Sequence, residues 1–139
     1  MTGLSKNPLP NVAGLLLETP FVSVREMLVV LYPQKWLPYR YLGAFLWNRW
    51  ELATEMDKIL ERGWRGKLLV LEAGADELVP VGHAREIASL ARNKGVEIDE
   101  VTVDGALHVE CLSRPKGRKA VVEYLRGMAE NKKRPVREQ

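Results

Sequence analysis

The stretch 68-LLVLEAGADELVP-80 decides the fold of this chain. It begins with four consecutive aliphatic residues, a pattern typical of a parallel strand that is covered on both faces. Gly74, Asp76 and Pro80 then indicate a loop, because these residue types favour turns. A second segment, 105-GALH-108, follows the apolar stretch 98–103 in the same way. We therefore expect an aspartate and a histidine at the carboxyl ends of parallel strands, where α/β sheets place their chemistry.

The rest of the chain alternates between strand-like and helix-like segments. Strands are predicted over 12–17, 68–71 and 98–103, and helices over 24–31, 52–60, 84–91 and 121–128. Strands that alternate with helices in this order indicate an α/β fold with a parallel sheet and right-handed crossovers. The segment 98–103 carries charges and reads as an edge strand. The segment 12–17 is a continuous apolar run, so we expect it to be covered on both faces and to need a further neighbouring strand. Nothing in these residues can supply that neighbour, so we expect an unpaired edge beside Leu15, Leu16 and Leu17.

Several signals mark the helix boundaries. Ser23 and Glu26 have the spacing of a capping box, which predicts the start of the first helix. Gly63 and Gly95 are expected near the ends of the second and third helices. The last helix is expected to bury one apolar face, made by Val121, Tyr124, Leu125 and Met128.

Composition excludes several classes of protein. The single Cys111 rules out an internal disulfide and a cysteine-based metal site. Residues 131–139 carry four basic residues and one acidic residue, which account for the whole net charge of +3. The remainder is balanced, which argues against nucleic-acid binding. We expect residues 1–10 to be an irregular lead-in and 131–139 a basic disordered tail, with neither a signal peptide nor a membrane-spanning segment.

Three motifs together resemble one enzyme family. The segment 12-VAGLLLETPF-21 is similar to a V-A-G-L-x-L-E-N-T-F strand, 76-DELVP-80 matches a D-E-L-V-P acid loop, and 105-GALH-108 matches a G-A/T-x-H base loop. These motifs occur in this order in the C-terminal half of α/β-hydrolases, most closely the bud-emergence-type hydrolases and related α/β-hydrolase-domain proteins. The resemblance covers residues 11–128. It implies that 11–130 form part of an α/β-hydrolase domain with the family's strands six to eight.

The resemblance also implies a chemistry. The family hydrolyses esters or thioesters, protein-acyl (palmitoyl-protein) thioesters among them, through an acyl-serine intermediate and without a cofactor. Asp76 would be the triad acid and His108 the base, in the family's Ser-Asp-His chain order. Without that role, Asp76 would be a turn residue and His108 a polar loop residue. Glu77 and Glu18 are alternative acids, although Glu18 reads more simply as a loop-anchoring carboxylate.

The nucleophile of the triad has no counterpart in these 139 residues. No G-x-S-x-G string is present, and the serines at 5, 23, 89 and 113 lie in other contexts. Cys111 is expected to be a small packing residue, and His83 a surface residue at a helix start. The chain is therefore expected to be a truncated serine hydrolase that is inactive alone. In the family, the nucleophile lies in residues that precede this region. The alternative is a non-catalytic binding paralogue or truncated gene product that associates through strand 12–17, with itself or a partner.

Two further expectations follow from the resemblance. The segment 21–50 corresponds to a lid, and its aromatic part, 34–50, would either line an acyl pocket or pack between helices. Members of the family are often membrane-anchored, so the resemblance implies membrane association, whereas the residues themselves leave the compartment open.

Overall fold

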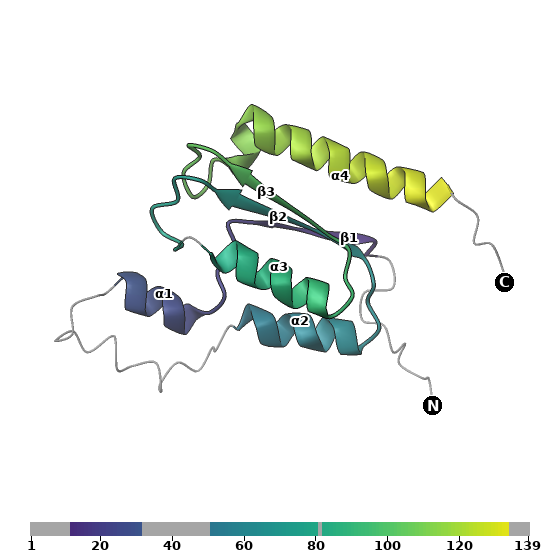
Figure 1. The fold of residues 1–139 in the computed structure, drawn as a ribbon, viewed down its shortest axis with the longest axis horizontal. Coiled ribbons are helices and arrows are strands. Elements are labelled where there is room, and N and C mark those ends of the chain that lie inside the picture. The colour runs from purple at the N-terminus through teal and green to yellow at the C-terminus, as the bar shows by residue number, and fades with distance from the viewer. Residues whose placement is uncertain (1–11, 32–50, 81, 134–139) are drawn as a thin grey trace.

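Strands and helices alternate along the chain and build a three-stranded parallel sheet (Figure 1). The computed structural model describes residues 12–31, 51–80 and 82–133. The strands are β1 (Gly14–Glu18), β2 (Lys67–Ala73) and β3 (Ile98–Val103), in the spatial order β1-β2-β3. The helices are α1 (Val24–Leu31), α2 (Leu52–Glu61), α3 (His83–Asn93) and α4 (Pro115–Lys133), with a short 3₁₀ turn, η3, at Cys111–Ser113. The prediction of an α/β fold with a parallel sheet is confirmed.

The register of the sheet aligns the carboxyl ends of its strands. Glu18 of β1 pairs with Leu71 of β2, and Ala73 of β2 pairs with Val103 of β3. The loops that follow the three strands therefore begin at the same edge of the sheet. One of these loops contains Asp76 and another contains His108.

Helices cover both faces of the sheet. Figure 1 shows α2 and α3 on one face and α4 on the other. Alternate residues of β2 point to opposite faces, as a strand requires. Leu68 and Val70 pack into a core with residues of α2 and α3, namely Met56, Leu60, Ala84, Ile87 and Ala91. Leu69 and Leu71 pack into a second core with Val103, Cys111, Ala120 and Tyr124. Strand β2 is thus covered on both faces, as its aliphatic run predicts.

Strand β1 has an unpaired edge in the described part of the chain, as predicted, and it is buried less than a run covered on both faces would be. None of its five residues is fully buried, and Leu16 is 36% exposed. The physical reason is position, because β1 pairs only with β2 in the described part of the chain and forms an edge of the sheet. Strand β3 forms the other edge, as predicted. An aliphatic run shows that a strand can be buried. The number of neighbouring strands decides whether the strand is buried in the fold.

Gly14 allows α4 to dock against β1. The Tyr124 hydroxyl donates to the carbonyl oxygens of Leu15 at 3.1 Å and Lys67 at 2.7 Å. A Cβ atom at Gly14 would overlap that hydroxyl and approach Met128 Sδ to 2.6 Å. Helix α4 buries Tyr124 but leaves Leu125 exposed, so the predicted inclusion of Leu125 in the buried face is wrong.

Some predicted segments lie outside the described residues. These are the lead-in 1–10, the aromatic stretch 34–50 and most of the predicted lid. Residues 24–31 of that lid segment form α1. Helix α4 continues to Lys133, so residues 131–133 are helical and not part of a disordered tail as predicted. None of the helices in the described ranges combines the length and the apolar character that a membrane span requires.

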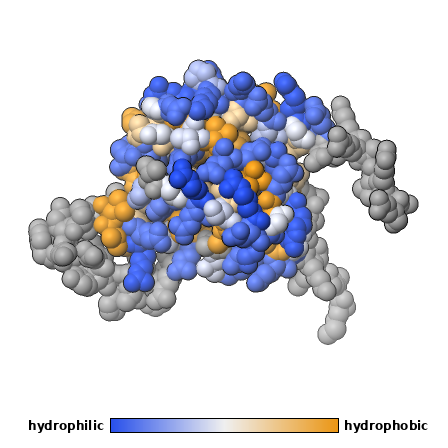
Figure 2. Space-filling model, viewed as in Figure 1, coloured by the Kyte–Doolittle hydropathy of each residue, from blue (hydrophilic) through white to orange (hydrophobic). Residues whose placement is uncertain are grey.

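Hydrophobic side chains also reach the surface away from the sheet. Val29 and Val30 of α1 are exposed. Figure 2 shows hydrophobic residues at the α1 end of a face that is otherwise largely hydrophilic.

Candidate functional site

Asp76 lies in the loop after β2 and is held in one orientation. Its Oδ1 accepts the main-chain N–H groups of Leu78 and Val79, both at 2.8 Å. Its Oδ2 lies 3.0 Å from Nδ1 of His108. The Asp76 side chain is only 5% exposed. A buried carboxylate with these partners has little freedom to rotate, so the loop presents it to the histidine in a fixed geometry.

The ionisation of Asp76 is set by two opposing effects. Burial raises its pKa, because the charged form loses hydration. Hydrogen bonds from the Val79 N–H, the His108 ring and the Leu78 N–H lower it and outweigh burial, so the pKa of Asp76 lies below its usual value. Asp76 is therefore a carboxylate at neutral pH.

His108 lies in the loop after β3, where Gly105 turns the chain with a φ of 67°. Its N–H donates to Glu77 Oε2 at 3.2 Å, and its carbonyl accepts the Thr19 hydroxyl at 2.9 Å. Because Asp76 is ionised and accepts from Nδ1, the ring proton belongs on Nδ1. Nε2 then carries the lone pair, and it makes no hydrogen bond to residues 12–31, 51–80 or 82–133. The side chain is 24% exposed, which leaves the ring accessible.

The three candidate acids have different partners. Glu18 accepts the N–H of Leu112 at 3.1 Å and so ties the end of β1 to the turn η3. Glu77 binds the main chain of His108. Of the three, Asp76 is the one whose carboxylate pairs with the His108 ring. The prediction that Asp76 and His108 face each other at one end of the sheet agrees with these distances.

A cavity of about 400 Å³ opens beside His108. Its lining is mainly apolar and comes from the end of β1 and the residues after it, with Leu52 of α2: Leu16, Leu17, Glu18, Thr19, Pro20, Phe21, Leu52 and His108. A small organic group can therefore reach the histidine ring along an apolar wall. This cavity was not predicted from the sequence, because only folding brings Leu52 and His108 beside residues 16–21.

Cys111 is unsuited to act as a nucleophile. Its side chain is fully buried. Burial, followed by the negative charges of Glu18, Asp76 and Glu72, raises the pKa of the thiol to about 11. The thiol is therefore protonated at neutral pH, whereas a thiolate is the reactive form. Cys111 is a buried packing residue of the second core, as predicted.

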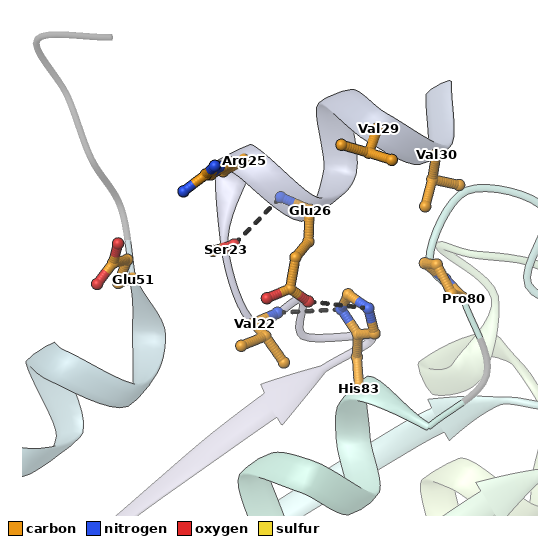
Figure 3. A pocket seen from close by; sticks show the side chains of 9 residues that line it. All are labelled: Val22, Ser23, Arg25, Glu26, Val29, Val30, Glu51, Pro80 and His83. Atoms are coloured by element: carbon orange, nitrogen blue, oxygen red, sulfur yellow. Dashed lines mark hydrogen bonds and ion pairs between the residues drawn. The ribbon is translucent and has the colours of Figure 1, made fainter. Parts of the chain in front are cut away.

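His83 is not the surface residue that the sequence predicts. Its side chain is 12% exposed, Nδ1 accepts the N–H of Val22 at 3.1 Å, and Nε2 lies 3.5 Å from Glu26 Oε2 (Figure 3). Ser23 caps α1 through the N–H of Glu26 at 3.2 Å, while the Glu26 carboxylate points to the histidine. His83 thus joins α3 to α1 at the side of a pocket of about 730 Å³. Helix position alone could not indicate this contact.

Within the described part of the chain, no cluster of three or more His, Cys, Asp or Glu side chains is arranged to hold a metal ion. The chemistry available at the site is thus that of an ionised carboxylate, a histidine and an apolar cavity. Comparison with protein-family models, curated proteins and solved structures finds no match to this chain.

Proposed function

We propose that Asp76 and His108 are the acid and base of a Ser-His-Asp triad that hydrolyses an ester or a thioester. The observation that carries this proposal is the 3.0 Å contact between Asp76 Oδ2 and His108 Nδ1, with the carboxylate buried and the ring partly exposed. An orienting acid on Nδ1 and a free lone pair on Nε2 are what a general base needs. The resemblance of the acid and base loops to those of α/β-hydrolases supports the same assignment.

The roles of the two residues follow from their geometry. His108 Nε2 takes the proton of a serine hydroxyl as the serine attacks the substrate carbonyl, and Asp76 stabilises the imidazolium that forms. The imidazolium then protonates the leaving alcohol or thiol, and a water molecule repeats the cycle on the acyl-serine. General acid–base catalysis of this kind contributes about 10²–10⁴-fold to the rate.

The serine has to come from outside these 139 residues, which contain no G-x-S-x-G string. In the described part of the chain, β1 has a neighbouring strand on one side only, and we propose that the serine enters on the other side. A strand added parallel to β1 would end at the same edge of the sheet as the loops that carry Asp76 and His108. Leu16 and Leu17 of β1 line the same cavity as His108, so a residue at that strand end would be close to the ring.

A split-enzyme experiment tests this proposal. The nucleophile-bearing half of a bud-emergence-type hydrolase is produced as a separate chain and mixed with this one, complex formation is measured by light scattering, and p-nitrophenyl butyrate hydrolysis is followed. We expect the complex to hydrolyse the ester at least 10²-fold faster than either half, and His108→Gln and Asp76→Asn to remove that gain. Complexes that form equally with wild-type chain and His108→Gln but hydrolyse at the same rate would contradict the proposal.

One observation favours a second function, association without catalysis. Strand β1 carries no lysine or proline to protect its edge, and Leu16 is 36% exposed. Such an edge is a template for pairing with a second copy of the chain or with another protein. Light scattering of the wild type and Leu16→Lys tests this function. Self-association that Leu16→Lys abolishes supports it, whereas a monomeric wild type argues against self-association.

A further inference from the structure

Thr19 has an unusual backbone conformation. Its φ is 45°, and among residues 12–31, 51–80 and 82–133 every other residue with positive φ is a glycine. A β-branched residue rarely adopts positive φ, because its Cβ substituents crowd the main chain. The following Pro20 adds to the strain, since a residue before proline is driven towards extended conformations with negative φ.

The contacts of Thr19 show what maintains this conformation. Its N–H donates to the carbonyl of Leu71 at 2.8 Å and continues the ladder between β1 and β2. Its hydroxyl donates to the carbonyl of His108 at 2.9 Å, across 89 positions of sequence. The residue is 8% exposed, so the hydrogen bonds are protected from water. Strained backbone persists where the surroundings over-determine it, and such residues cluster at functional sites.

We propose that Thr19 is a positioning residue for His108. The turn at Thr19 directs its hydroxyl to the His108 carbonyl, which fixes the main chain that carries the ring. The other main-chain tie at this residue, from the His108 N–H to Glu77, lies at the exposed surface. Thr19 therefore provides the hydrogen bond that is shielded from water, and this bond holds the main chain of His108 in place beside Asp76.

The positioning role of Thr19 concerns the geometry of Asp76 and His108. It rests on the proposed function only in that this geometry would serve catalysis by His108. Its test is therefore a measurement on the ring and needs no substrate or partner. Ring ¹⁵N chemical shifts, recorded by NMR on the full chain at about pH 8, report the ratio of the Nδ1–H to the Nε2–H tautomer of His108. That pH lies above the range in which histidine side chains ordinarily titrate.

Four variants separate the effect of the Thr19 hydroxyl from the effect of the strained backbone at Thr19. Thr19→Val keeps the branched shape and loses the hydroxyl, Thr19→Ser keeps the hydroxyl, and Thr19→Gly loses it while relieving the strain. Thr102→Val is the matched control, because the Thr102 hydroxyl binds Glu72 at 3.0 Å rather than the His108 loop. Thermal unfolding of each variant is measured alongside the spectra.

We expect the Nδ1–H to Nε2–H ratio to fall by roughly three- to tenfold in Thr19→Val and Thr19→Gly, the range that corresponds to the loss of one hydrogen bond. Thr19→Ser should retain the wild-type ratio, and so should Thr102→Val. Thr19→Gly should unfold at a temperature no lower than Thr19→Val does, because glycine accepts positive φ without strain.

Three results would overturn the inference. The first is a wild-type tautomer ratio in Thr19→Gly and Thr19→Val. The second is a ratio in Thr19→Ser as low as in Thr19→Val. The third is an equal fall in Thr102→Val, which would indicate general loosening of the fold. If the split enzyme fails while the tautomer ratios behave as expected, the positioning role stands and the hydrolase proposal does not.

Discussion

Replacing Asp76 with asparagine removes one charged interaction and leaves the size of the side chain unchanged. The asparagine carbonyl can still accept the N–H groups of Leu78 and Val79, which both bind Oδ1 of the aspartate. Its amide group then faces Nδ1 of His108, so the hydrogen bond to a charged acceptor is lost whichever ring nitrogen carries the proton. A hydrogen bond to a charged group is worth about 1.5–3 kcal/mol. We therefore expect Asp76→Asn to lower the free energy of unfolding by about 1.5–3 kcal/mol at neutral pH.

The pH dependence of this difference has a definite sign. The pKa of Asp76 in the folded chain lies below its ordinary value of 3.8. A depressed pKa stabilises the fold above the unfolded-state pKa, and this stabilisation is lost as the pH falls through the folded-state pKa. The stability gap between wild type and Asp76→Asn should hence be constant at neutral pH and shrink as the pH falls below about 3.8.

Urea unfolding followed by circular dichroism, repeated between neutral and acidic pH, measures both quantities. Asp104→Asn is the matched control, because Asp104 forms an exposed ion pair with Lys116 at 2.7 Å. Exposed pairs contribute little to stability, so this variant should unfold almost like the wild type. If Asp76→Asn is as stable as the wild type at neutral pH, or if the gap does not change on acidification, Asp76 is not the ionised partner of His108.

Three further outcomes are expected. Gly14→Ala should destabilise the chain by about 1–3 kcal/mol, since its Cβ overlaps the Tyr124 hydroxyl. Gly127→Ala, inside α4, should stabilise it by about 0.5–1 kcal/mol in the same urea assay, because its Cβ would meet Lys67 Nζ at 4.0 Å, an ordinary van der Waals contact. Equal effects would contradict the docking of Tyr124 over Gly14. Cys111 should react with a thiol reagent such as DTNB only after unfolding, because the thiol is buried and its pKa is raised to about 11; rapid modification of the native chain would disagree. The chain alone should not be labelled by a fluorophosphonate probe, and stoichiometric labelling of any serine would show that a nucleophile is present after all.

The sequence was sufficient for the parts of the structure that depend on local pattern and on parallel topology. The aliphatic run of β2 and the loop at Asp76 are local signals. The meeting of Asp76 with His108 follows because parallel strands end at one edge. The unpaired edge of β1 was also predicted, whereas the partial burial of its residues was not, because a run of leucines does not show how far neighbouring elements cover it.

Two other features depend on contacts that the sequence does not encode locally. Thr19 has a positive φ, and its hydroxyl binds the His108 carbonyl across 89 positions; a threonine in the sequence indicates neither feature. The bond between His83 and Val22 forms because α3 packs beside the residues that precede α1. Both contacts join elements that are distant in sequence, so only the folded chain brings them together.

We propose that Asp76 prepares His108 to act as a base, and the tautomers of the two histidines, His83 and His108, test this proposal together. The structure assigns the Nδ1–H tautomer to His108, whose Nδ1 donates to Asp76, and the Nε2–H tautomer to His83, whose Nδ1 accepts from Val22. Ring ¹⁵N chemical shifts of the wild-type chain at about pH 8 distinguish the two forms. We expect opposite tautomers, with Nε2 unprotonated in His108. A His108 ring that carries its proton on Nε2 could not accept a proton from a serine, and that result would contradict the assignment of acid and base.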